Sequence, residues 1–411
     1  MITCYLDSQD YSTLSDPKGW TSEKSQIRDA LLNFAKEESV KFVFSAAAIS
    51  EAASISPDTS KLAELKAELL VQLCGTNALI SFDRVVSAET EALAEGFGAP
   101  ATILDPHGNW FPKINTLDVS HSPIKYMQEQ MERALMETGM SRQQSRTAVR
   151  KNIKNGAPRG EFKKHMDSQN IELLAAEFSK PFPMKSEHAE MVVRFWLGRA
   201  TEAEFDEALN EGLRDPHHMM KWFTTSHALA SPISDIVRRP GRELGAHLRE
   251  LVALAVRHAA LLKEGDTDAA PTGKDGEILQ RWGEQRDNQL VNLVQRVAQA
   301  KGVSLKNVTP KSVDKFCPGI SATIRSLYSS AWDNVAGGRK EELSDSQPVD
   351  ALHAMYAPYV CVFRADRYMA PHIQKQVKRH GTIVVSRLSD LVQTLSREVA
   401  SYRLTTVEIS P

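Results

Sequence analysis

Short apolar runs alternate with helical periodicities over the first part of the chain. Ile2–Leu6, Lys41–Ser45 and Ala78–Phe82 are rich in β-branched and aromatic residues, which favour strands. Between them, apolar residues recur at helical spacing over Ser25–Glu38 and Ser60–Leu73. Strands that alternate with helices predict a parallel α/β sheet, because each crossover between parallel strands needs room for a helix.

The same alternation returns near the end of the chain. Tyr359–Phe363 and Thr382–Ser386 have strand composition, and Ala370–His380 between them has helical character. We therefore expect a fold of the α/β class with five parallel strands.

A long middle region separates these two parts. Residues 96–344 show helical periodicities and loops but no convincing strand. Its clearest predicted helices are Glu190–Leu197, Glu202–Leu213, Arg242–Leu262 and Glu277–Ala300. The sequence thus predicts an α/β domain made of residues 1–95 plus 345–411, and an all-helical insertion domain over residues 96–344.

Composition adds limits to this picture. The chain has 411 residues, 42% of them hydrophobic and 25% charged, which is ordinary for a globular protein. Its net charge of −2 gives no global basic character that would indicate a nucleic-acid or membrane partner. The four cysteines form no C-x-x-C pair, and the first residues lack a secretory signal pattern. We expect reduced thiols, no membrane partner and a cytoplasmic location.

Acidic residues follow several of the predicted strands. Asp7 and Asp366 come just after strands, Glu51 lies in a helix that follows another, and Asp350 lies in the first turn of a short helix. The carboxyl ends of parallel strands meet at one edge of a sheet, where ligands bind. Each acid also has a structural interpretation, as a turn residue, an N-cap or a favourable charge at a helix start. Together, crowded carboxylates suggest a bound Mg²⁺ or Mn²⁺.

Three segments resemble the PIN-like nuclease superfamily. They are YLDSQDYSTL, FSAAAISEAA and VDALHAMYAPYVCVFRADRYM, and the resemblance covers roughly residues 1–95 and 345–411. It implies a three-layer α/β/α domain and a metal-dependent endonuclease, often acting on RNA. It also implies that Asp7, Glu51, Asp350 and Asp366 are the catalytic, metal-binding acids. The large helical insertion departs from the compact members of the family and leaves the substrate class open.

Other residues near these motifs have two interpretations each. Asp10 is either a further metal or water ligand or a helix-capping acid. His353 either orients a ligand or packs as a satisfied histidine. Arg364 and Arg367 flank Asp366 and either contact substrate phosphates or neutralise the acids.

Charge is unevenly divided between the two predicted domains. The α/β parts hold 21 acidic and 16 basic residues, whereas the insertion holds 31 acidic and 34 basic residues. Residues 142–164 carry eight Lys and Arg against the single acid Glu161. We predict that Arg150, Lys151 and Lys154 in this segment contact nucleic-acid phosphates, with a solvated basic helix face as the alternative.

These observations predict a metal-dependent endonuclease that hydrolyses phosphodiester bonds with a metal-activated water, in RNA in preference to DNA. Two alternatives stay open. One is a catalytically inert PIN-like scaffold whose helical insertion binds a protein or nucleic-acid partner, or a second copy of the chain. The other is an unrelated doubly wound domain that binds a phosphorylated small molecule.

Overall fold

The computed structural model describes most of the chain. The described residues are 1–52, 60–96, 98, 100, 102–105, 110–111, 123–154, 157–179, 185–212, 239, 241–246, 248–250, 252–253, 277–336 and 347–407. They divide into two compact units, a sheet unit (Met1–Pro112 with Ala230–Pro411) and a helical unit (Lys113–Leu229). The described residues between 239 and 336, which the sequence assigned to the insertion, therefore group with the sheet unit.

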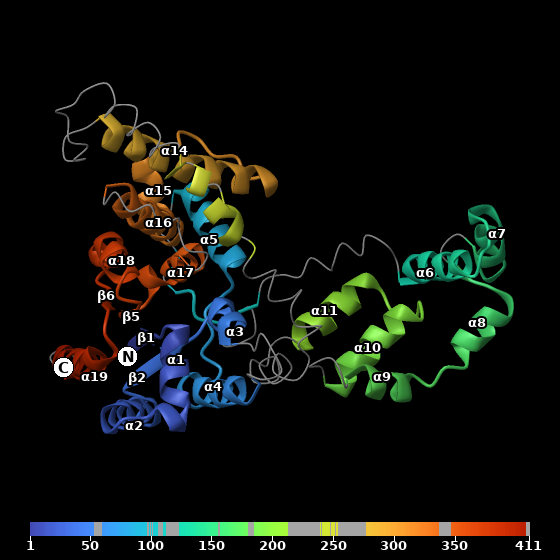
Figure 1. The fold of residues 1–411 in the computed structure, drawn as a ribbon, viewed down its shortest axis with the longest axis horizontal. Helices are drawn as coiled ribbons and strands as arrows, with labels where there is room; N and C mark the ends of the chain where they lie inside the picture. The colour runs from blue at the N-terminus through green and yellow to red at the C-terminus, as the bar shows by residue number, and fades with distance from the viewer. Residues whose placement is uncertain are drawn as a thin grey trace. The chain divides into compact units, whose positions relative to one another are not determined.

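The sheet unit contains a four-stranded parallel sheet (Figure 1). Its strands are β1 (Ile2–Tyr5), β2 (Val40–Val43), β5 (Val362–Arg364) and β6 (Ile383–Val385), in the order β2-β1-β5-β6. β1 lies in the middle, because Tyr5 pairs with Val43 on one side and Phe363 on the other. A central strand of a parallel sheet is covered on both faces, which explains its apolar composition.

The prediction of a five-stranded sheet is wrong. The run Ala78–Phe82 forms only isolated bridges, one parallel between Phe44 and Ala78 and one antiparallel between Leu79 and Leu104. Ser81 is already the N-cap of helix α5, so the extended run is too short to form a ladder. The expected five-stranded PIN-like sheet is thus replaced by four strands, while the α/β class is loosely retained.

Helices surround this sheet. Figure 1 shows α2 and α4 near β2, and α18 near β6, as their contacts also indicate, while α1 packs against α4. The helices described in the sheet unit, with 3₁₀ turns marked η, are α1 (Ser8–Ser15), η1 (Pro17–Gly19), α2 (Ser22–Lys36), α3 (Ala46–Ala52), α4 (Ser60–Cys74), α5 (Phe82–Glu95), α14 (Glu277–Ala300), α15 (Pro310–Phe316), α16 (Pro318–Ala336), α17 (Gln347–His353), η3 (Ala354–Tyr359), α18 (Met369–Val377), η4 (Lys378–His380) and α19 (Leu388–Val407).

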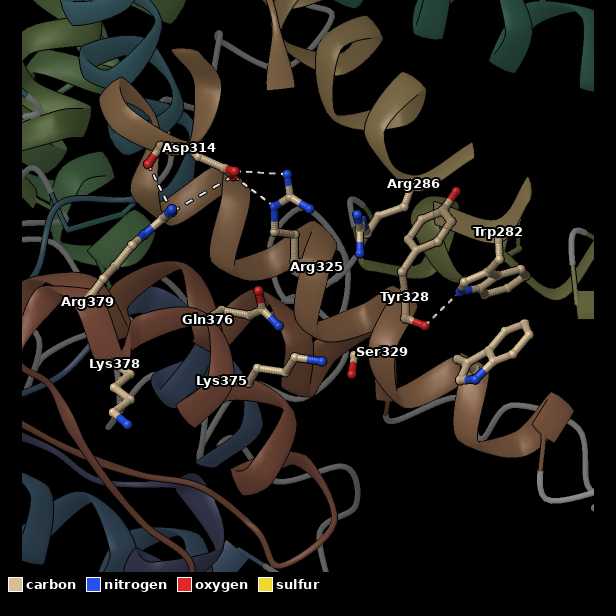
Figure 2. Close-up of a pocket in the computed structure, with 11 residues that line it drawn as sticks. Trp282, Arg286, Asp314, Arg325, Tyr328, Ser329, Lys375, Gln376, Lys378 and Arg379 are labelled. Carbon is tan, nitrogen blue, oxygen red and sulfur yellow. Dashed lines mark hydrogen bonds and ion pairs between the residues drawn. The ribbon is translucent and has the colours of Figure 1, made fainter. Parts of the chain in front are cut away.

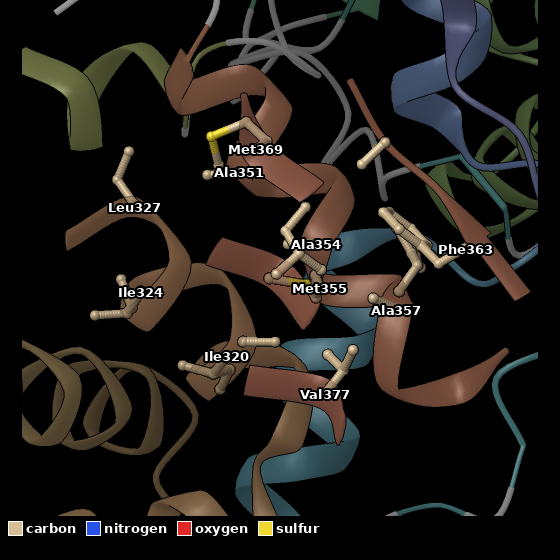
Figure 3. Packing of buried hydrophobic residues seen from close by; sticks show 14 of the residues in the cluster. Ile320, Ile324, Leu327, Ala351, Ala354, Met355, Ala357, Phe363, Met369 and Val377 are labelled. Carbon is tan, nitrogen blue, oxygen red and sulfur yellow. The ribbon is translucent and has the colours of Figure 1, made fainter. Parts of the chain in front are cut away.

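Helix α16 is central to the hydrophobic core of the sheet unit. Ile320, Ile324 and Leu327 recur at spacings of four and three, so they share one face of the helix and are buried. The core they enter includes Met355 of η3 and Phe363 of β5 (Figure 3). The sequence around α16 was assigned to the insertion, yet its buried face belongs to the core that also supports the sheet.

The helical unit is small and mostly α-helical. Its elements are α6 (Pro123–Glu137), α7 (Arg142–Asn152), β3 (Ile153–Lys154), β4 (Ala157–Pro158), α8 (Gly160–Asp167), α9 (Ile171–Ser179), α10 (Ser186–Trp196) and α11 (Glu202–Gly212). β3 and β4 form a two-stranded antiparallel hairpin, so the prediction that this region is all-helical needs correction. Helices were correctly predicted at α10, α11 and α14, whereas Arg242–Leu262 lies partly outside the described residues.

Two further observations concern the chain as a whole. All four cysteines are free thiols. Within the described ranges, no helix has both the length and the apolar character that crossing a membrane would require.

Candidate functional site

The carboxyl ends of β1, β5 and β6 carry charged residues at equivalent positions. Asp7, Asp366 and Arg387 each lie two residues after the last residue of their strand. Because the strands are parallel, these positions lie along one edge of the sheet.

Asp7 begins helix α1 as its N-cap. Its Oδ1 accepts a hydrogen bond from the backbone N–H of Gln9 at 3.0 Å. Asp10 completes a capping box by accepting from the backbone N–H of Asp7 at 3.3 Å. The capping interpretation of both residues therefore has direct support, and Asp7 also faces the small cavity described below.

Asp366 caps the helix that follows it. Its Oδ1 accepts from the backbone N–H of Met369, the first residue of α18, at 2.6 Å. No hydrogen bond is made by Oδ2 of Asp366 or by Oδ2 of Asp7 within the described part of the chain. Each acid thus offers a second oxygen for a ligand.

Asp350 reaches the same region from helix α17. The segment 241–246 packs against the start of this helix, and a Cβ atom at Gly245 would overlap the ring of Pro348.

The pKa of Asp350 is perturbed by its surroundings. Burial, with repulsion from Glu51, Asp366 and Asp7, raises the pKa of Asp350 to about 7, although His353 partly opposes this rise. The charges of Glu51, Asp366 and Asp7 therefore all act on the carboxyl group of Asp350.

Asp7, Asp350 and Asp366 line a single small cavity. Its volume is about 10 Å³, which is close to the minimum for one water molecule. His353 and Arg364 also line it. The cavity has room for a water or a small ion but not for a substrate.

Glu51 joins this group through His353. Nε2 of His353 lies 3.1 Å from Oε1 of Glu51, and Nδ1 lies 2.5 Å from Oη of Tyr5. Burial alone would lower the pKa of His353, but the adjacent Glu51 carboxylate raises it to about 9. His353 is consequently a cation at neutral pH, and both ring nitrogens donate.

Tyr5 continues this hydrogen-bonded chain inward. Its hydroxyl lies 2.7 Å from Oγ of Ser45, and its ring stacks on Phe363 with centroids 5.1 Å apart. The sequence prediction missed Tyr5 and Ser45. Both lie at the carboxyl end of a predicted strand, and this position could have indicated that they belong to the site.

Arg364 is committed to a structural ion pair. Its NH2 lies 3.1 Å from Oδ1 of Asp10, and NH1 donates to the carbonyl oxygens of Ala365 and Val385. Both side chains are almost fully buried. Burial raises the pKa of Asp10 to about 7, although Arg364 partly opposes this. These contacts support neutralisation of an acid, and not substrate binding, as the role of Arg364.

A wider pocket adjoins the small cavity. Its volume is about 380 Å³, and it shares Asp366 and Arg364 with the cavity. Arg367, which is exposed, and Arg387 also line it. A pocket of this size is sufficient for part of a phosphorylated ligand. Arg387 was missed by the sequence prediction, although its position after β6 matches that of Asp366 after β5.

The predicted basic segment lies in the helical unit. Arg150 and Lys151 are exposed in the last turn of α7, and Lys154 lies in β3. Cations at a helix C-terminus are favoured by the helix dipole whatever their function.

The donor chemistry of the acids suits Mg²⁺ or Mn²⁺, since all four offer carboxylate oxygens. Within the described ranges, however, no group of three or more His, Cys, Asp or Glu side chains is arranged to hold a metal ion. The oxygens left for a cation are Oδ2 of Asp7, Oδ2 of Asp366 and the carboxylate of Asp350. The residues therefore fit the predicted ion by their chemistry, and three of them line one cavity, but the described side chains are not arranged as a metal site.

Comparisons of the chain with family models, curated proteins and solved structures give no match. The PIN-like resemblance thus stays a prediction from the sequence motifs.

Proposed function

We propose that the protein is a PIN-like, metal-dependent endonuclease that hydrolyses phosphodiester bonds, in RNA in preference to DNA. The observation that carries this proposal is that Asp7, Asp350 and Asp366, from three separate segments, line one cavity. Crowding of like charges at Asp350 is costly for the fold, and clusters of strongly perturbed groups mark functional sites.

In this proposal, Asp7, Asp350 and Asp366 hold Mg²⁺ or Mn²⁺, and Glu51 contributes to the negative field. A divalent cation bound there supplies a water of lowered pKa and stabilises charge on the phosphate oxygens. His353 orients the Glu51 carboxylate and limits the net negative charge that the substrate meets. Arg367 and Arg387 bind the substrate phosphate in the adjoining pocket. A cytoplasmic location is part of the same proposal and agrees with the four free thiols.

The test is incubation of the protein with labelled single-stranded RNA and DNA in the presence of Mn²⁺. We expect cleavage by the parent and at least a hundred-fold loss in Asp366→Asn, a magnitude typical of losing a residue that acts on the reacting centre. An asparagine still accepts the hydrogen bond from Met369, so the start of α18 is kept. Asp390→Asn, at an exposed first-turn position of α19, is the matched control.

The inert-scaffold alternative has one specific observation in its favour. Asp7 and Asp366 both cap helices, so their presence has a structural reason independent of a metal. Titration calorimetry with Mn²⁺ separates the two proposals, because the nuclease binds at least one ion and loses it in Asp7→Asn. Absence of metal binding by the parent would favour the scaffold.

A further inference from the structure

A second, larger cleft lies in the sheet unit and has no part in the site described above. Its volume is about 770 Å³, and it is formed by α14, α16 and the end of α18 with η4 (Figure 2). Its lining contains five cations and one acid, which are Arg286, Arg325, Lys375, Lys378, Arg379 and Asp314. This composition is strongly positive for a unit whose sheet-forming parts are acidic.

The cations of this basic-aromatic cleft are not equivalent. Arg325 is neutralised by Asp314, at 2.7 Å from its Nε, and by Asp287, at 3.0 Å from its NH1. Lys375 and Lys378 are exposed and make no ion pair or hydrogen bond with any other described residue. These two ammonium groups are therefore available for an anionic ligand.

Aromatic rings form the other wall of the cleft. The ring of Trp282 lies 5.2 Å from that of Tyr328 and 5.9 Å from that of Trp332, measured between centroids. Tyr328 is buried, whereas Trp332 is only half-buried. The exposed part of the Trp332 ring is therefore open to a flat ring of a ligand.

Helix α18 connects the cleft with the carboxylate site. Met369 and Ile373 line the small cavity, whereas Lys375 lines the cleft. Lys375 follows Met369 by six residues, about 9 Å along a helix axis.

From these features we infer that the basic-aromatic cleft binds single-stranded nucleic acid, with a base against Trp332 and the neighbouring phosphates against Lys375 and Lys378. Stacking platforms beside a cationic groove are the means by which proteins bind single strands without reading sequence. As a substrate subsite, this inference rests on the proposed nuclease function. Strand binding itself requires neither a metal nor catalysis.

The experiment measures binding of a fluorescein-labelled 12-nucleotide RNA by anisotropy in EDTA. We expect Lys375→Glu and Lys378→Glu each to weaken binding about ten-fold and to lower the slope of log affinity against log salt by about one. Trp332→Leu should weaken it about ten-fold, and Trp332→Phe should restore part of the loss. Lys311→Glu, an exposed substitution outside the cleft on α15, is the matched control.

Two comparisons separate the possible failures. Asp366→Asn should bind the strand as the parent does, so a loss of cleavage with intact binding concerns the carboxylates alone. If the parent cleaves RNA while the Lys375, Lys378 and Trp332 variants bind like the parent, the cleft inference is overturned and the nuclease proposal stands. Equal affinity for a mononucleotide and for the 12-nucleotide strand would also overturn it, because the ligand would then be a free nucleotide.

Discussion

Nε2 of His353 lies 3.1 Å from Oε1 of Glu51, and this contact joins helix α17 to helix α3 across about three hundred positions of sequence. The pair is mostly buried, so each partner protects the other from an uncompensated charge. Three of the five predictions below concern this pair and the carboxylates beside it.

His353→Gln should lower the free energy of unfolding by about 1–3 kcal/mol, because a buried carboxylate loses its charged donor. The pKa of His353 is raised in the folded protein to about 9, so its contribution is fully present below pH 6.5 and is lost as the pH rises through 9. Thermal denaturation between pH 6 and pH 10 should show this loss in the parent and a flatter profile in the variant. The exposed His165→Gln serves as a control, and parallel profiles of parent and His353→Gln would contradict the assignment.

Asp350→Asn should have the opposite effect on stability. The folded-state pKa of Asp350 is raised to about 7, so the folded protein loses stability as the pH rises from about 4 to 7. Removing the carboxylate should raise the free energy of unfolding at pH 8 by roughly 1–2 kcal/mol after allowance for solvent screening, with little change at pH 4. Calorimetric melting at the two pH values tests this, and a variant less stable than the parent at pH 8 would refute it.

The affinity for Mn²⁺ should rise as the carboxyl group of Asp350 loses its proton. A cation displaces the proton of Asp350, so Mn²⁺ affinity should rise about ten-fold between pH 6 and pH 8, with the midpoint near 7. At pH 6, calorimetry in buffers of different ionisation enthalpy should detect release of up to about one proton per ion. An affinity that is constant over this range would exclude Asp350 as a ligand.

Gly319→Ala should destabilise the core. A Cβ atom at Gly319 would lie 2.6 Å from the carbonyl oxygen of Met355 and 2.7 Å from Oε1 of Glu89. Glu89 is fully buried and binds the N–H groups of Gly319 and Ile320 at the start of α16, so little can move. We expect a loss of about 1–3 kcal/mol by chemical denaturation.

The matched control for this substitution is Gly283→Ala. This position lies inside α14, and the nearest atom to an added Cβ is the flexible end of Arg286 at 4.0 Å. Alanine is the better helix former, so stability should rise by up to about 1 kcal/mol. Similar effects of the two substitutions on the free energy of unfolding would show that overlap of a Cβ atom at Gly319 with Met355 and Glu89 does not destabilise the core.

Charge reversal of Arg150, Lys151 and Lys154 should weaken nucleic-acid binding and flatten its salt dependence, if this segment contacts phosphates. Each lost phosphate contact lowers the slope of log affinity against log salt by about one. The control reverses three cations elsewhere, Lys18, Lys306 and Lys311, which are exposed. Equal losses in both triple variants would point to net charge alone.

The sequence predicted the elements that depend on local pattern. β1, β2, β5 and β6 all lie in runs of strand composition, and Asp7 and Asp366, each placed after a strand end, line one cavity, whereas Glu51 does not. Strand-end position is a topological signal, because parallel strands bring such residues to one edge in any sheet of this class.

The contacts made by α16 could not be predicted in this way. Its apolar face resembles that of any amphipathic helix, and the sequence does not indicate which surface covers it. The predicted fifth strand does not form for a local reason, because Ser81 is the N-cap of α5 and ends the extended run. The sequence left phosphate binding and neutralisation of the acids both open for Arg364, because its ion-pair partner Asp10 lies 354 positions away in the chain.

The capping bonds of Asp7 and Asp366 restrict how this protein can change over evolution. A lineage that abandoned hydrolysis would still be under selection for a hydrogen-bond acceptor at positions 7 and 366, and would drift toward asparagine or serine there. Position 350, where the charge only weakens the fold, would be free to become apolar. The pattern of replacement at these three positions among relatives would therefore record whether the chemistry has been kept.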